Sequence, residues 1–353
     1  MNSKKLQKGG RDSTNIQAEN INIGIAYGDA KKIAEDVFKA NFLKLTDMAE
    51  KVAYERVSDL IEKFLEELRV RSPDSVRSFQ DPDMQYDLFI AQRDYARSGN
   101  QSLFEMLIDL LVERAKANES SILQIVLNEA IATVAKLLPI HLDTLSVNYL
   151  VNQIKIQGSK EISDFKDYLR LFIPFCEYIS TNGSVYQHLE YTGCSVISHD
   201  QGIGMMPTPL VGIWKSRYPY LFSRGFSESE LLEALPRDYD LSQLPLTKDS
   251  TSHKLYFEIN KADELRKLNL GLGPNSMEKL VHFYNSILEN NENVQKLLLS
   301  WFPELELLLS QWHRSLLHRM SLTSVGVAIA SANIRRKTGV EFDLSHYFAT
   351  RNV

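Results

Sequence analysis

The pattern that stands out most lies near the start of the chain, where apolar and small polar residues alternate over residues 14–27. Alternation with a period of two predicts a β-strand, because successive side chains of a strand point to opposite faces. The phase changes between Ala18 and Ile21, and a two-residue turn at 19–20 accounts for this change by placing all the apolar side chains on one face. We therefore expect a short N-terminal β-hairpin.

A long helical pattern follows, from Asp29 to about Arg71. Its apolar positions form two seams with alternating steps of three and four residues, as in a helix packed lengthwise on another helix. The first seam comprises Phe38, Phe42, Leu45, Ala49 and Val52, and the second comprises Val57, Ile61, Phe64 and Leu68. A step of five separates the seams and rotates the apolar stripe. We therefore expect the two halves to pack on different neighbours, or the helix to bend near Tyr54.

Helical periodicity continues through the first half of the chain, after a polar linker at 72–83. It predicts helices over residues 84–97, 101–117, 120–138 and 142–154. Their short joints are typical of an antiparallel bundle.

The second half of the chain mixes helical patterns with two short strand patterns, at 194–198 and 254–259. Residues 294–319 carry apolar side chains on much of their surface, which predicts a helix at the centre of the fold. A last helix is expected over 323–337.

These patterns together predict a mainly α fold: an antiparallel helical bundle with a short N-terminal β-hairpin and a small two-stranded element in the C-terminal half. A length of 353 residues suggests about two domains. We expect a flexible tail and hairpin over 1–27, the helical bundle over 28–158, and a mostly helical C-terminal domain with short strands over 159–353.

Charge and cysteine content narrow the function classes. The 40 Lys and Arg residues against 45 Asp and Glu residues give a net charge of −5, which disfavours a general nucleic-acid binder. The two cysteines are too far apart for a CxxC pair, and reduced thiols indicate a cytoplasmic protein. No apolar run predicts a secretory signal or a membrane span, so no membrane partner is expected.

The predicted hairpin is the first candidate functional element. An isolated two-stranded hairpin is marginally stable in water, and its open edges can pair with other chains. Its amide side chains could add ladders to such an assembly. The candidate self-association residues are Ile16, Gln17, Ala18, Ile21, Asn22, Ile23 and Ile25. We predict a homo-oligomer formed through the hairpin and the long helix; packing of the hairpin on the protein's own helix, and a different protein partner, remain open.

A second candidate is the loop at 199–212, which is rich in glycine and proline. Such a loop can present His199 and Asp200 to a ligand. Gly202 and Gly204 lack the third glycine of a dinucleotide fingerprint, and an irregular connector is the structural alternative. A hydrolase or nuclease-like effector with its site near this loop is therefore kept as an alternative function.

The remaining chemistry is sparse. Histidines 313 and 318 are five residues apart, whereas a helical metal pair needs a spacing of four, so we predict no metal and no cofactor. The basic cluster Arg335, Arg336 and Lys337 is a candidate phosphate contact. Its position at the end of a predicted helix favours a structural role against the negative C-terminal pole.

Three segments resemble landmarks of an uncharacterised bacterial family of similar length. They are Gly10 to Ala18, Phe38 to Phe42 with Leu45 and Ala49, and Leu322 to Ala330. The entry hairpin is similar to those at the front of many bacterial anti-phage and mobile-element proteins. That family turn is usually glycine-rich, whereas this chain has Glu19 and Asn20, of which Asn20 better tolerates a tight hairpin.

The resemblance supplies no catalytic residues. It implies a role in bacterial anti-phage defence, and the residues favour a protein that is not an enzyme. The leading hypothesis is therefore a non-enzymatic, oligomerising sensor, scaffold or effector.

Overall fold

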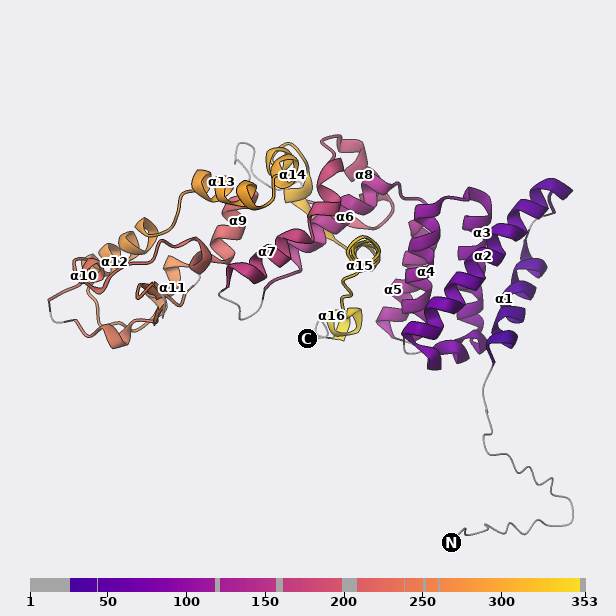
Figure 1. Cartoon of the computed structure of the whole chain (residues 1–353), viewed down its shortest axis with the longest axis horizontal. Coiled ribbons are helices and arrows are strands. Elements are labelled where there is room, and N and C mark those ends of the chain that lie inside the picture. The colour runs from indigo at the N-terminus through magenta and orange to yellow at the C-terminus, as the bar shows by residue number, and fades with distance from the viewer. Residues whose placement is uncertain are drawn as a thin grey trace, which may run out of the picture.

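The computed structural model describes residues 26–42, 44–117, 121–156, 161–198, 208–237, 239–249, 252–259 and 261–349. These residues are mainly helical and form an elongated arrangement, with the first helices at one end and residues 226–287 at the other (Figure 1). The mainly α prediction is thus confirmed. The predicted hairpin lies outside the described residues.

The first half of the chain forms helices that pack side by side (Figure 1). They are α1 (Tyr27–Asn41), α2 (Asp47–Arg71), the 3-10 helix η1 (Pro73–Gln80), α3 (Pro82–Ser98), α4 (Gln101–Lys116) and α5 (Ile122–Val134). Local chemistry sets their ends: Asp81, Asn100 and Ser121 accept hydrogen bonds from backbone N–H groups of the first turns. Gly99 ends α3 at a φ of +59°, in the left-handed region that favours glycine.

The prediction of one continuous helix from Asp29 to about Arg71 is wrong. The chain leaves the helical conformation between Asn41 and Asp47, and α1 folds back along α2 and α3. Neither proline nor glycine occurs in this joint. The fold-back buries Ala30, Ala34 and Phe38 of α1, so tertiary burial outweighs local helix propensity here.

The central helix of the fold is α15 (Ser324–Thr338), which packs on α4, α5 and α6 (Pro139–Asn152). Nine consecutive residues of α15, from Gly326 to Ile334, are buried. The position of Gly326 brings α15 very close to the chain: an added Cβ would lie 1.9 Å from the carbonyl oxygen of Cys194. Only glycine, which carries no Cβ, fits at this crossing.

The predicted central helix over 294–319 is a second error. These residues form α13 (Asn291–Trp301), α14 (Leu305–Gln311) and the 3-10 helix η5 (Leu317–Arg319). The chain turns at Phe302 and Pro303, so the two apolar stripes do not share one axis. Leu297 and Leu307 are exposed as a result.

Two small antiparallel sheets are present in the described residues, not one. Strand β1 (Ser195–Ile197) pairs with β4 (Met320–Leu322), and β2 (Leu246–Lys248) pairs with β3 (Leu255–Phe257). Both predicted strands exist, but each belongs to a different sheet. Ser195 lies opposite Leu322, and Leu246 lies opposite Phe257.

The other elements connect these parts. They are α7 (Ile162–Arg170), η2 (Ile173–Tyr178), α8 (Gly183–Tyr191), α9 (Leu210–Arg217), η3 (Pro219–Phe222), α10 (Glu228–Leu232), η4 (Leu241–Gln243), α11 (Ala262–Lys267), α12 (Pro274–Ser286) and α16 (Leu344–Ala349). In the described part of the chain, no helix has the length and apolar character needed to cross a membrane.

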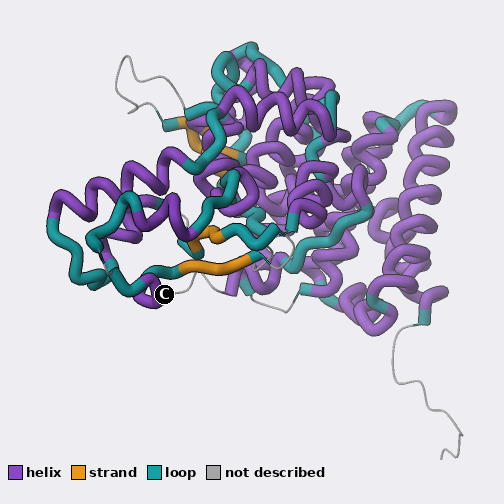
Figure 2. The backbone as a smooth tube through the Cα atoms, turned by 60° about the vertical axis from the view of Figure 1, so that its left-hand side comes forward, coloured by secondary structure: helices purple, strands orange, loops and turns teal. Residues whose placement is uncertain are grey.

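The buried apolar residues form two clusters. The larger takes residues from α1 through α9 and from α13 through α16, and so draws on both sides of position 158. The smaller lies within residues 226–287, which we call the outer lobe; the rest of the described chain is the body. The outer lobe extends away from the body (Figures 1 and 2). The predicted domain boundary at residue 158 stays a prediction. The division that the structure shows is the one between the body and the outer lobe, which have separate apolar clusters.

Candidate functional site

Most residues proposed from the sequence lie outside the described residues. This holds for the self-association set Ile16 to Ile25 and for His199, Asp200, Gly202 and Gly204 of the loop. The hairpin assembly and the loop-based enzyme therefore stay predictions. The basic cluster at the end of α15 can be placed.

Each cation of that cluster has a carboxylate partner in the described residues. Arg335 Nη1 lies 2.6 Å from Asp109 Oδ1, and Arg336 Nη1 lies 3.0 Å from Glu105 Oε2. Lys337 Nζ lies 2.8 Å from Asp143 Oδ1 and also donates to the carbonyl oxygen of Pro174. A phosphate at this position would have to compete with these carboxylates. The cluster therefore joins α15 to α4 and α6, and phosphate contact there stays a prediction.

The ion pairs around Asp109 extend into a larger network. Arg71 at the end of α2 donates to Asp109 at 2.9 Å and to Glu113 of α4. Glu341, between α15 and α16, accepts from Arg71 at 3.3 Å and from Lys116 at 3.1 Å. Burial raises the pKa of the Asp109 carboxyl to about 6, although Arg71 beside it acts in the opposite direction. This network fixes three helices against one another.

A second polar network joins α3, α4 and α5. The buried guanidinium of Arg114 lies 2.9 Å from both Asp83 and Asp87. Asp83 also accepts hydrogen bonds from the amides of Gln124 and Asn128, at 2.8 Å each. These groups satisfy one another, as buried polar groups must, and their role is structural.

His141 and His188 are also engaged by the backbone. The rings of His141 and His188 lie 4.8 Å apart. His141 Nδ1 accepts a hydrogen bond from Leu138 N–H, and His188 Nε2 lies 2.8 Å from the carbonyl oxygen of Lys136. Among the described residues, no group of three or more His, Cys, Asp or Glu side chains could hold a metal ion.

The strongest surface feature is the start of α2. Every residue from 44 to 52 is exposed, and we call this segment the α2 overhang. Three of its side chains are large and apolar: Leu45 is 39% exposed, Met48 is 85% exposed and Val52 is 45% exposed. Their spacing of three and four residues places Met48 and Val52 on one side of the helix, with Leu45 just before its first turn.

The α2 overhang extends from a rigid base. The Phe38 ring stacks on Phe42 at 4.4 Å and meets Tyr54 edge-on at 5.3 Å, which holds the end of α1 against α2. Just beyond, Arg56 donates a hydrogen bond to the carbonyl oxygen of Ala96 in α3. Figure 1 shows α2 beginning at the right-hand edge of the bundle, beyond the neighbouring helices. An apolar helix end is therefore presented to solvent by a fixed support.

Part of this surface can be predicted from the sequence. Leu45 and Val52 belong to the first predicted seam, but the seam indicates only that a face is apolar and not which chain covers it. Met48 lies outside the three- and four-residue steps of that seam, so the seam does not predict it.

The model of one protein family matches residues 24–348. Because this match covers most of the chain, the chain belongs to that family, which is uncharacterised. A search of curated proteins and a search of solved structures gave no match.

Proposed function

We propose that this protein is a non-enzymatic, self-associating scaffold, sensor or effector, and that it acts in bacterial anti-phage defence. The observation that carries the self-association is the α2 overhang, with its three exposed apolar side chains. The defence context has separate support: the entry hairpin that starts with residues 10–18 is similar in sequence to those of many bacterial anti-phage and mobile-element proteins.

The overhang has the properties of an interface that a second subunit covers. Fully burying a Leu, Met or Val side chain contributes roughly 1.5–3 kcal/mol, so the three side chains together favour association by several times the thermal energy. Association also costs translational and rotational freedom, of the order of 4–15 kcal/mol. The overhang alone is therefore a weak contact, and a stable assembly needs a further surface.

The partner that fits best is another copy of this chain. The charged residues of the overhang have both signs, because Lys44 and Lys51 accompany Asp47 and Glu50. A surface of mixed sign can be complementary to itself about a two-fold axis, whereas a strongly charged partner would require one sign.

The predicted hairpin would supply the further surface. The chain enters α1 at Tyr27, at the end of the bundle opposite to the α2 overhang (Figures 1 and 2). Two contact surfaces at opposite ends of one subunit allow assemblies larger than a dimer. We therefore propose that the overhang and the segment 14–25 link different neighbours.

Light scattering of a double variant tests the overhang. Met48→Glu with Val52→Glu places charges on the apolar stripe, and Glu is tolerated near the start of a helix. We expect a smaller particle mass than for the unmodified protein. Ile125→Glu is the control, because Ile125 is 61% exposed in the first turns of α5; it should leave the mass unchanged. An unchanged mass for the double variant would show that the overhang does not mediate assembly.

Deletion of residues 1–25 tests the second surface in the same instrument. We expect a reduced but not fully monomeric particle, since the overhang remains. A particle of undiminished stoichiometry would remove the hairpin from the proposal.

The defence role needs a separate assay. A bacterial host that expresses the protein should show fewer plaques on infection with at least some of a panel of unrelated phages. The Met48→Glu, Val52→Glu variant should restore plaque numbers if assembly is required. Equal plaque numbers with and without the unmodified protein, over the whole panel, would contradict the defence role but leave self-association standing.

A further inference from the structure

A cleft of about 660 Å³ lies between the body and the outer lobe. The body contributes Arg217 at the end of α9 and Tyr220 of η3, and the outer lobe contributes Phe257 of β3, Ile259 and Glu264. We call this space the lobe cleft. Its volume falls within the range of about 300–1,000 Å³ that is typical of small-molecule sites, which often lie where two parts of a fold meet.

Three cations from separate elements line the lobe cleft: Lys155 after α6, Arg217 of α9 and Lys261 before α11. Within the described part of the chain, none of the three has a carboxylate within ion-pair distance. This contrasts with the cluster at the end of α15, in which every cation is paired. Two carboxylates, Glu258 and Glu264, also line the cleft, so the three cations leave it a net charge of about +1. A cavity with a positive balance of this kind favours an anionic ligand.

Arg217 retains most of its binding capacity. One N–H group donates to the carbonyl oxygen of Val151 at the end of α6, which fixes the side chain next to the cleft. A second N–H group contacts the Tyr168 hydroxyl. A guanidinium has five N–H donors, so three remain for other partners. Their fixed planar arrangement suits the oxygens of a phosphate group.

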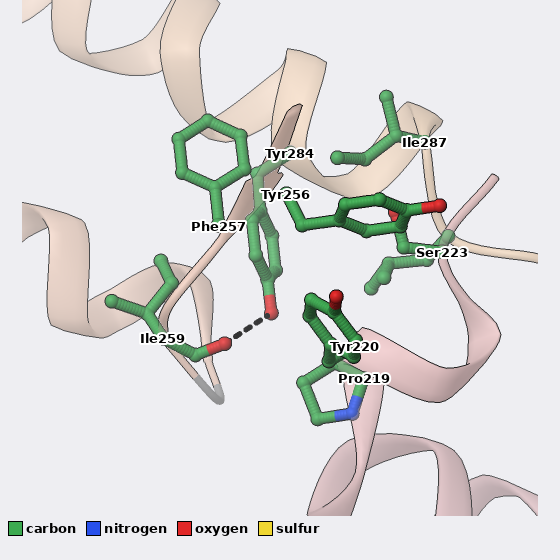
Figure 3. Close-up of a pocket in the computed structure, with 9 residues that line it drawn as sticks. Pro219, Tyr220, Ser223, Tyr256, Phe257, Ile259, Tyr284 and Ile287 are labelled. Carbon is green, nitrogen blue, oxygen red and sulfur yellow. Dashed lines mark hydrogen bonds between the residues drawn. The ribbon is translucent and has the colours of Figure 1, made fainter. Parts of the chain in front are cut away.

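An aromatic wall adjoins these cations. The Tyr220 ring packs on Tyr256 with ring centroids 4.7 Å apart. Tyr220 also lines a cavity of about 10 Å³ that shares Phe257 and Ile259 with the lobe cleft, and Figure 3 shows Tyr256 and Tyr284 beside it. The Tyr284 hydroxyl donates to the carbonyl oxygen of Ile259 at 3.5 Å, which supports this wall from the outer lobe.

The position of Tyr256 depends on a glycine. Gly225 has a φ of +65°, and an added Cβ would lie 2.8 Å from Cζ of the Tyr256 ring. The chain therefore passes directly against the ring and holds it under Tyr220. A preorganised aromatic surface of this kind can stack on a flat ring, which is the way that proteins often hold a nucleobase.

The outer lobe joins the body through two adjacent segments. Arg224 N–H donates to the carbonyl oxygen of Ile287 at 3.0 Å, and Glu289 N–H donates to that of Phe222 at 2.8 Å. Because the apolar clusters of the lobe and the body are separate, a ligand in the lobe cleft would contact both parts and hold them together.

We propose that the lobe cleft binds a nucleotide, with its phosphates against Lys155, Arg217 and Lys261 and its base on the Tyr220 ring. A nucleotide has both an anionic group for the three cations and a flat ring for the Tyr220 side chain. This inference is independent of the proposed self-association.

Isothermal titration of the full chain with ATP, GTP, CTP and UTP tests the proposal. We expect at least one of the four to bind, and the double variant Lys155→Met with Lys261→Met to weaken that binding by about tenfold or more, because charge-assisted hydrogen bonds are the strong ones. Lys296→Met is the matched control: it removes one exposed lysine outside the cleft, and it should leave the affinity unchanged. Absence of binding with all four nucleotides at millimolar concentration overturns the proposal.

Two further measurements refine the test. The first distinguishes the contribution of the base from that of the phosphates, and the second distinguishes binding of a nucleotide from binding of an RNA chain. Tyr220→Ala should weaken nucleotide binding and leave tripolyphosphate binding unchanged, while Tyr220→Phe should retain both. Equal affinity of Tyr220→Ala and the unmodified protein for the nucleotide overturns the stacking assignment. A single-stranded RNA that binds more tightly than any nucleotide, and through the same two lysines, reassigns the cleft to a nucleic acid and overturns the small-molecule proposal.

Discussion

Asn333 Nδ2 donates a hydrogen bond to Asp143 Oδ1 at 3.1 Å, and so joins α15 to α6 across 190 positions of sequence. Both residues are buried. The same amide nitrogen donates to Ser146 Oγ at 2.8 Å, and the amide oxygen accepts from the guanidinium of Arg336 at 2.8 Å. One asparagine thus forms hydrogen bonds with side chains of both α6 and α15.

Replacement of Asn333 by alanine should destabilise the fold. The change leaves the buried acceptor on Ser146 without its donor, which costs about 1–3 kcal/mol. It also removes one donor from Asp143, which keeps its contact with Lys337. We expect the free energy of unfolding in urea to fall by a comparable amount. Asn293→Ala is the control, because Asn293 is exposed on α13; its unfolding midpoint should move far less. Equal midpoints for the two variants would contradict the role of the buried network.

Replacement of Gly326 by alanine should be more damaging than its size suggests. The added Cβ would lie 1.9 Å from the carbonyl oxygen of Cys194, so α15 and the β1–β4 sheet must separate. Overpacking of this kind typically costs about 1–3 kcal/mol and sometimes more. Gly183→Ala is the matched control, since an added Cβ there meets nothing within 4 Å. Thermal unfolding of both variants checks the expectation, which fails if Gly326→Ala is as stable as Gly183→Ala.

The stability of the protein should depend on pH through Asp87. Burial raises the pKa of the Asp87 carboxyl to about 6, and the neighbouring Arg114 offsets only part of this effect. Because the pKa in the folded chain is above the ordinary value of 3.8, the folded state binds more protons than the unfolded state between these two pH values. The contribution of Asp87 to the free energy of unfolding therefore decreases as the pH rises from about 4 to about 6.

Urea unfolding of Asp87→Asn at several pH values between 4 and 7 measures this contribution. The variant should show a flatter pH dependence than the unmodified protein. Part of the slope should remain, because the pKa of Asp109 is also raised to about 6 and acts with the same sign. Asp263→Asn removes an exposed carboxylate as the control. Parallel pH profiles for Asp87→Asn and the unmodified protein would contradict the assignment.

Arg335 should contribute to stability and not to phosphate binding. Its contact with Asp109 lies in a partly buried network, and a hydrogen bond between charged groups contributes about 1.5–3 kcal/mol at most sites. We expect Arg335→Met to lower the free energy of unfolding and to leave the affinity for tripolyphosphate unchanged. A loss of affinity together with a weaker salt dependence would instead support the phosphate contact predicted from the basic cluster.

Several element ends could be predicted from sequence because their signals are local. Gly99 with Asn100 separates α3 from α4, and Thr323 and Gly339 bound α15, each by a contact within a few residues. The division of the long helix had no such signal. It depends on the burial of Phe38 against Tyr54, which a periodic pattern does not reveal.

The pairing of strands that lie far apart in the sequence could not be predicted either. The pattern at 194–198 predicts a strand correctly, but its partner β4 is only three residues long and follows directly on a 3-10 helix. Nothing in such a short segment specifies the strand with which it will pair.

The candidate sites, too, could be predicted from the sequence only in part. Leu45 and Val52 could be recognised as apolar helix positions, whereas their exposure depends on the fold-back of α1. Lys155, Arg217 and Lys261 come from three separate elements and form no motif in sequence. Only the folded chain brings them to one cavity.

The late position of α15 in the sequence has a consequence for synthesis. Helices α4, α5 and α6 precede α15 in the sequence, so they leave the ribosome well before the helix that covers their apolar faces. Domains generally fold as their residues emerge during synthesis. Until residue 338 has been translated, those faces have no native cover. Nascent chains that stall before that point would expose a large apolar surface, and they would be natural substrates for ribosome-associated chaperones and proteases.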